Sequence, residues 1–110
     1  MTHLIDTNFL ARLLVQDNSQ QLQEVLDFID KAVTRNDPLV VDKMVVFELV
    51  YVLSGKIYQL TKTEVKDKVL ELMDLSCFTF EDSHLISKAL KLFAEHSVDI
   101  ADAYLITKAV

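Results

Sequence analysis

The chain has 110 residues, enough for one domain with its own core and too few for two. Hydrophobic residues make up 51% and charged residues 25%, a balance that excludes a disordered chain. Acidic residues outnumber basic ones by 17 to 11, and the net charge is −6. The overall field therefore repels nucleic acid, and an RNA ligand would need divalent cations or a local basic surface.

The cysteine content and the hydropathy of the chain indicate in which cellular compartment the protein is located. The single cysteine, Cys77, excludes an internal disulfide and fits a reducing environment. The N-terminus has no signal-peptide pattern, and the longest apolar segment is too short to span a bilayer. We therefore expect a soluble, cytoplasmic protein without a membrane partner. The one local concentration of basic residues fits a solvated helix face better than a nucleic-acid surface; it comprises Lys56, Lys62, Lys66 and Lys68.

The first part of the chain predicts two strands and two helices. Residues 3–5 form a short, buried strand, and residues 8–15 form a short helix. Asn18, with a glutamine three residues later, is a capping-box pattern that opens a longer amphipathic helix. The turn sequence at residues 36–38 ends this helix, and residues 39–41 form the second strand.

The middle of the chain predicts two further helices. Asp42 is a good N-cap for an apolar helix that ends near Gly55. Thr61 and Glu64 form a second capping-box pattern, and the helix that they open continues to Met73.

The last part of the chain predicts a strand and two helices. Residues 77–80 have strand-forming side chains, and Asp82 or Ser83 caps the helix that follows. Asp99 opens a final helix that is still running at the end of the sequence. Strands that alternate with amphipathic helices indicate an α/β fold with a parallel sheet, whose ligand site lies at the carboxyl ends of the strands.

Three acidic residues have apolar neighbours on both sides in the sequence: Asp6, Glu48 and Asp102. Charges in such surroundings cost several kcal/mol unless they are paired, protonated or bound to a cation, by roughly the known desolvation penalties. A shared hard cation such as Mg²⁺ or Mn²⁺, which prefers oxygen ligands, would offset that cost. No cysteine and histidine spacing suggests zinc, and the three histidines are expected at the surface.

Simpler interpretations exist for most of these acids. Asp6 could cap the helix that follows it, and Asp99 is well placed as the N-cap of the last helix. Asp102 would then lie in the first turn, where negative charge favours the helix dipole. Glu48 lies in the middle of MVVFELVYVL, where neither explanation applies.

Three sequence blocks, LIDTNFL, VFELVYVL and VDIADAYLI, resemble the PIN domain, and more narrowly the small PIN-domain toxins of the VapC type. The resemblance implies a three-layer α/β/α sandwich and a ribonuclease that depends on Mg²⁺ or Mn²⁺. It implies that Asp6, Glu48 and Asp102 are metal ligands, with Asp99 as an additional catalytic acid and Asn8 as a supporting residue. The expected partners are an RNA substrate, a cognate antitoxin and a second copy of the chain.

The family pattern continues beyond the last helix, through another parallel strand and a segment that supplies a fourth acid. This sequence contains no residue for either. We therefore expect residues 1–110 to form one PIN-like domain, truncated at the C-terminus, with residues 1–5 at an exposed sheet edge. The alternative to an enzyme is a non-catalytic PIN-like module that binds a partner protein.

Overall fold

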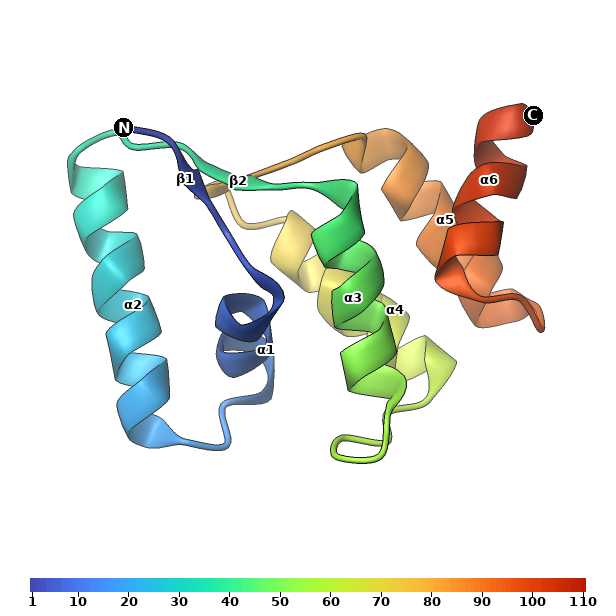
Figure 1. The fold of residues 1–110 in the computed structure, drawn as a ribbon, viewed down its shortest axis with the longest axis horizontal. Helices are drawn as coiled ribbons and strands as arrows, with labels where there is room; N and C mark the ends of the chain where they lie inside the picture. Colours follow the sequence, from blue (N-terminus) through green and yellow to red (C-terminus); the bar gives the residue numbers. More distant parts are fainter.

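The computed structural model describes residues 1–110, and its helices and strands follow the predicted order (Figure 1). From the N-terminus the elements are β1 (His3–Leu4), α1 (Thr7–Val15), α2 (Ser19–Thr34), β2 (Leu39–Val41), α3 (Lys43–Ser54), α4 (Lys62–Met73), β3 (Phe78–Phe80), α5 (Ser83–Glu95) and α6 (Ile100–Ala109). The fold is therefore α/β, consistent with a PIN-like α/β/α arrangement.

Local hydrogen bonds explain where the helices begin. The side chain of Asn18 accepts a hydrogen bond from the backbone N–H of Gln21 at 3.0 Å, and Asp42 accepts one from Val45 at 3.0 Å. The predicted capping box of α4 forms both of its bonds: the Glu64 N–H donates to the Thr61 hydroxyl, and the Thr61 N–H donates to the Glu64 carboxylate. These caps satisfy N–H groups that the first turn of a helix leaves without partners.

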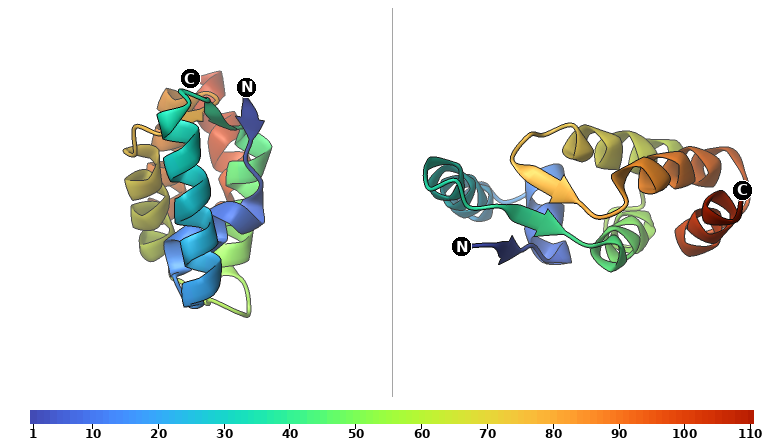
Figure 2. Two further views of the ribbon diagram at one scale, coloured as in Figure 1. Left: turned by 90° about the vertical axis from the view of Figure 1, so that its left-hand side faces the viewer. Right: turned by 90° about the horizontal axis from the view of Figure 1, so that it is seen from above.

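The three strands form a parallel sheet in the order β1-β2-β3. His3 lies beside Leu39 in the register of β1 with β2, and Leu39 lies beside Phe78 in the register of β2 with β3. Figure 2 shows the strands side by side, with helices packed around them. The central strand β2 is the best protected, because Leu39 and Val41 are 1% and 0% exposed.

The prediction that residues 3–5 are buried is wrong for most of the segment. Leu4 is 82% exposed, His3 is half-buried, and only Ile5, just after the strand, is buried. The reason is that β1 pairs only with β2 and its other edge has no neighbouring strand. The predicted exposed edge is therefore present in the structure.

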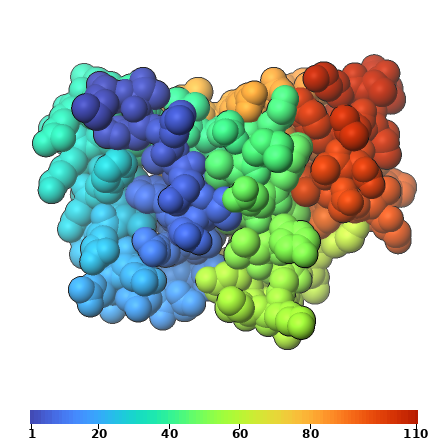
Figure 3. Space-filling view, viewed as in Figure 1, coloured from blue at the N-terminus to red at the C-terminus, as the bar shows by residue number.

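The hydrophobic core lies between the sheet and the helices that pack on it and on one another. The largest fully buried side chains come from α1, β2, α3, α4 and α5, and they are Leu10, Leu39, Val41, Val46, Leu49, Leu53, Val65, Val69, Leu72, Ile86 and Leu90. On the face shown in Figure 3, α3 (green) lies between the N-terminal segment (blue) and α6 (red). None of the six helices has the length and the hydropathy that a membrane crossing requires.

Lys62, one of the four lysines predicted to lie on a solvated basic face, binds other parts of the protein instead. The Lys62 ammonium donates hydrogen bonds to the backbone carbonyls of Phe93, His96 and Val98 at 3.2, 2.8 and 2.7 Å. It thereby satisfies carbonyl groups at the end of α5 and in the turn before α6. Lys66 lies 3.4 Å from the carboxylate of Asp67.

Candidate functional site

Acidic residues follow each strand of the sheet. Asp6 comes shortly after β1, Asp42 directly follows β2, and Glu81 and Asp82 follow β3. Because the strands are parallel, their carboxyl ends meet at one edge of the sheet, where ligands of open α/β sheets bind. This edge is therefore the candidate site.

Asp6 caps α1. Its Oδ1 accepts a hydrogen bond from the backbone N–H of Phe9 at 2.8 Å, in an extended backbone conformation typical of an N-cap. The side chain is exposed, so its charge is solvated. The capping interpretation of Asp6 is correct. Its surroundings do not require a cation, because water can solvate the exposed carboxylate. Asn8 is exposed in the first turn of the same helix.

Glu48 is exposed, and the prediction that its apolar segment buries it is wrong. One side of α3 carries the buried residues Val46, Leu49, Val50 and Leu53. Glu48 lies on the other side, which also exposes two apolar residues, Met44 and Tyr51. Water solvates the Glu48 carboxylate, so no metal ion is needed to explain a charge at this position.

The Glu48 carboxylate has one direct partner in the protein. The hydroxyl of Thr7 donates a hydrogen bond to its Oε2 at 2.8 Å. Thr7 is 8% exposed and is the only polar residue of the buried set. Because Thr7 follows Asp6 in the chain, this bond fixes the middle of α3 beside the segment that carries Asp6. Sequence reasoning missed Thr7, although it lies between Asp6 and Asn8 in the DTN block.

Asp99 and Asp102 form a capped first turn on α6. Asp99 Oδ1 accepts the backbone N–H of Asp102 at 2.8 Å, and both side chains are exposed. Asp102 is the third residue of the helix, where a carboxylate interacts favourably with the helix dipole. The cap and dipole interpretations of these two residues are therefore correct.

The predicted site residues come from three helices: Asp6 caps α1, Glu48 lies in α3, and Asp99 and Asp102 lie at the start of α6. Thr7 joins Glu48 to the Asp6 segment, whereas Asp99 and Asp102 lie on α6. Carboxylates are the oxygen ligands that Mg²⁺ and Mn²⁺ prefer. No group of three or more His, Cys, Asp or Glu side chains is arranged so that it could hold a metal ion. The donor chemistry therefore suits a divalent cation, but the present arrangement does not provide a three-residue ligand set.

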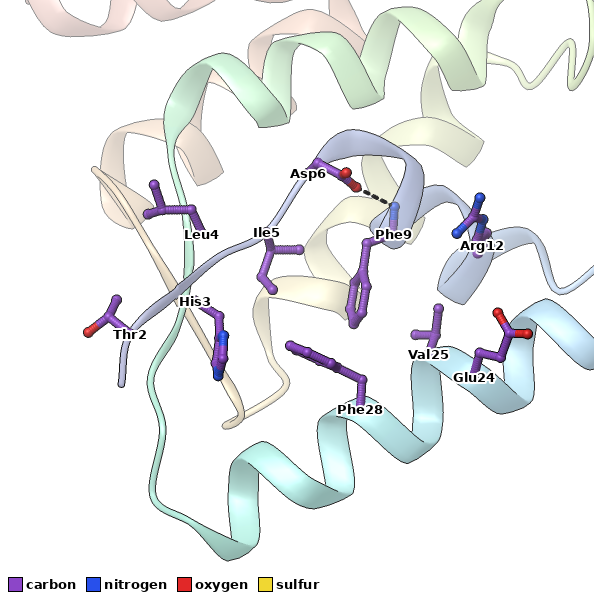
Figure 4. A pocket seen from close by; sticks show the side chains of 10 residues that line it. All are labelled: Thr2, His3, Leu4, Ile5, Asp6, Phe9, Arg12, Glu24, Val25 and Phe28. Atoms are coloured by element: carbon purple, nitrogen blue, oxygen red, sulfur yellow. Dashed lines mark hydrogen bonds between the residues drawn. The ribbon is translucent and has the colours of Figure 1, made fainter.

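Asp6 also lies at the edge of an open pocket of about 440 Å³ between β1, α1 and α2 (Figure 4). Three aromatic rings line it: His3 and Phe28 have centroids 5.0 Å apart, and Phe9 and Phe28 have centroids 5.6 Å apart. Figure 4 shows Arg12 and Glu24 at the end of the pocket farthest from His3. The pocket thus brings aromatic rings and charged groups next to the candidate carboxylate.

A second polar cluster lies at the ends of β2 and β3. The Tyr104 hydroxyl donates a hydrogen bond to Asp82 Oδ2 at 2.7 Å, and the Lys43 ammonium lies 3.8 Å from the same oxygen. The bond to Asp82 and the burial of the ring raise the pKa of Tyr104. The phenol oxygen of Tyr104 is the main cause of the raised pKa of Lys43, and Glu81 and Asp82 add to it. Sequence reasoning missed this cluster, because its members are far apart in the chain.

The chain was compared with protein families, with curated proteins and with solved structures. The sequence model of the family described as PIN domain matches residues 3–110, almost the whole chain. No curated protein and no solved structure matches it. The parallel sheet and the acids at its carboxyl edge agree with this match. The chain therefore belongs to the PIN domain family.

Proposed function

We propose that this protein is a metal-dependent endoribonuclease that hydrolyses phosphodiester bonds of RNA. PIN domains are generally nucleases, and the chain matches that family over residues 3–110. The observation that carries the proposal is the hydrogen bond from Thr7 to Glu48, because it fixes one candidate acid beside the segment of another. The ions that suit these carboxylates are Mg²⁺ and Mn²⁺.

Asp6, Glu48 and Asp102 are the proposed metal ligands, Asp99 is a further catalytic acid, and Asn8 supports the site. A divalent cation, when bound, would supply positive charge at the scissile phosphate. The contribution of the chain itself is orientation. The Thr7 hydroxyl donates a hydrogen bond to the Glu48 carboxylate, and the Phe9 N–H donates one to Oδ1 of the exposed Asp6.

The direct test is cleavage of a mixed RNA substrate by the purified protein in Mn²⁺. We expect cleavage that stops on addition of EDTA and in Asp6→Asn. The matched control is Asp30→Asn, which changes an exposed aspartate of α2 away from the candidate residues and should cleave like the wild type. Cleavage that persists in EDTA or in Asp6→Asn would contradict the proposal.

The biological role that we propose is that of a cytoplasmic toxin in a type II toxin–antitoxin pair, acting as a homodimer and bound by a cognate antitoxin. The net charge of −6 favours a basic antitoxin segment as the partner of the acidic site. Affinity for the antitoxin should then fall as salt concentration rises. A salt-independent affinity would contradict this electrostatic recognition.

The second candidate is a non-catalytic PIN-like module that binds a partner protein. Two observations favour it: the acids are not gathered into a group of three, and the edge of β1 is exposed. A protein that binds a partner but cleaves no RNA in Mg²⁺ or Mn²⁺ would establish this alternative in place of the nuclease.

A further inference from the structure

Helix α6 has one side-chain hydrogen bond to the rest of the protein. The other side-chain bonds of α6 stay within its own segment: Asp99 accepts the N–H of Asp102, and the Thr107 hydroxyl donates to the carbonyl of Ala103. Only the Tyr104 hydroxyl reaches another element, where it donates to Asp82 at 2.7 Å. The orientation of α6 therefore depends on this contact and on apolar packing.

The Asp82 side chain bonds to Tyr104 instead of capping its own helix. It lies at the N-cap position of α5, where an aspartate ordinarily accepts a hydrogen bond from the helix, yet its side chain makes no capping bond. Its backbone is left-handed, with φ 51°, which is unfavourable for most side chains. Its Oδ2 instead accepts from Tyr104 and lies 3.8 Å from the Lys43 ammonium.

The same tyrosine joins α6 to α3. Tyr104 is 4% exposed, and its ring packs edge-on against Phe47, with centroids 5.4 Å apart. The Lys43 ammonium lies 5.4 Å from the centre of the ring. Phe47 precedes Glu48 in α3, so Tyr104 contacts the immediate neighbour of a proposed site residue. The α3 helix, α6 and the end of β3 therefore meet at one side chain.

The position of Tyr104 fixes the direction of Asp102. Residues two apart in an α-helix are rotated by about 200°, so they point to nearly opposite sides. Tyr104 is buried and Asp102 is exposed, as this geometry requires. Rotation of α6 about its axis would move the Asp102 carboxylate relative to Glu48, and the Tyr104–Asp82 bond opposes that rotation.

We infer that Tyr104 is a positioning residue that acts through Asp82 to hold α6, and with it Asp102, at a fixed orientation to α3. The inference rests on the proposed function where it assigns Asp102 to the metal site. The orientation of α6 can nevertheless be measured without any activity.

The orientation is tested by spin labels on α3 and α6. In a Cys77→Ala background, labels at Tyr51→Cys and Leu105→Cys lie on exposed positions, 81% and 61% exposed in the native residues. We expect Tyr104→Phe to broaden the distribution of distances between the labels. Asp82→Asn keeps an oxygen acceptor and tolerates the left-handed backbone, so it should retain the narrow distribution. An unchanged distribution in Tyr104→Phe would overturn the inference.

The link to the site is tested by titration of the unlabelled protein with Mn²⁺ alone. We expect Tyr104→Phe to weaken Mn²⁺ binding about tenfold, the lower end of effects seen when a group that orients a ligand is removed. Tyr51→Phe makes the same chemical change on an 81% exposed side chain and should bind like the wild type. A lower Tm with unchanged Mn²⁺ affinity would make Tyr104 merely structural and overturn the inference. Failure of the wild type to bind Mn²⁺ would instead contradict the proposed function, and the assignment of Tyr104 to the site would fall with it.

Discussion

The Lys62 ammonium caps the C-terminal end of α5, and its removal should destabilise the whole domain. It donates hydrogen bonds to three backbone carbonyls, and its Nζ lies 4.4 Å from the centre of the Phe93 ring. Lys62→Met keeps most of the apolar stem and removes the charge and all three donors. The carbonyl of Val98 directly precedes Asp99, so the change also loosens the turn that leads into α6.

The size of the effect follows from these contacts. A hydrogen bond that involves a charged group contributes roughly 1.5–3 kcal/mol. Three bonds from one half-buried ammonium are not additive, and water replaces part of each, so we expect a total loss of roughly 2–3 kcal/mol. For a domain of this size that corresponds to a fall in Tm of about 10 °C.

Thermal unfolding followed by circular dichroism measures this loss. Lys66→Met is the matched control, because Lys66 lies one turn later on α4 and its only ionic partner is the neighbouring Asp67. Its effect should stay within about 0.5 kcal/mol, as for other surface pairs. Equal Tm values for the two variants would refute the capping role of Lys62.

Three further predictions follow from single contacts. Thr7→Val keeps the shape of the buried side chain but removes the hydrogen-bond donor to Glu48. It should lower the free energy of unfolding by about 1 kcal/mol and reduce RNA cleavage. Wild-type stability together with wild-type cleavage would show that Thr7 does not hold Glu48. Leu4→Lys places a charge on the exposed edge of β1, and light scattering at high concentration should show less self-association than in the wild type. Hydrogen bonds from the Met1 ammonium, and then from His3, lower the pKa of Asp37. The Asp37 carboxylate therefore stabilises the fold at pH values above its unfolded-state pKa of about 4. This stabilisation is lost as the pH falls through the lower pKa of the folded state. Urea unfolding between pH 5 and pH 2 should therefore show a shallower loss of stability in Asp37→Asn, and an equal loss would contradict the ion pairs.

Local sequence signals predicted where the elements begin and end. Capping residues such as Asp42, Thr61 and Asp99 act within three residues of their own position, so they can be recognised without the fold. The predicted order of helices and strands and the predicted parallel sheet were also confirmed. Alternation of short strands with helices leaves few other architectures.

Burial could not be predicted from composition in the same way. The segment around Glu48 is apolar on both faces of α3, because Met44 and Tyr51 are exposed residues with apolar side chains. An apolar neighbourhood in sequence therefore did not mean a buried neighbourhood in space. The strand β1 misled the prediction similarly, because an edge strand with apolar residues resembles a buried strand.

The contacts that shape the candidate site join distant residues. Thr7 and Glu48 are separated by 41 positions, Asp82 and Tyr104 by 22. Neither pair has a local signature, and only the fold brings their members together. The family resemblance suggested which acids to consider but gave no information on which side chains contact them.

The central claim is that Asp6, Glu48 and Asp102 together bind a divalent cation, and calorimetric titration with Mn²⁺ tests it most directly. We predict saturable binding to the wild type, weakened at least about tenfold in each of Asp6→Asn, Glu48→Gln and Asp102→Asn, and unchanged in Asp30→Asn. Absence of binding to the wild type, or wild-type affinity in Asp102→Asn, would contradict a site shared by these three carboxylates.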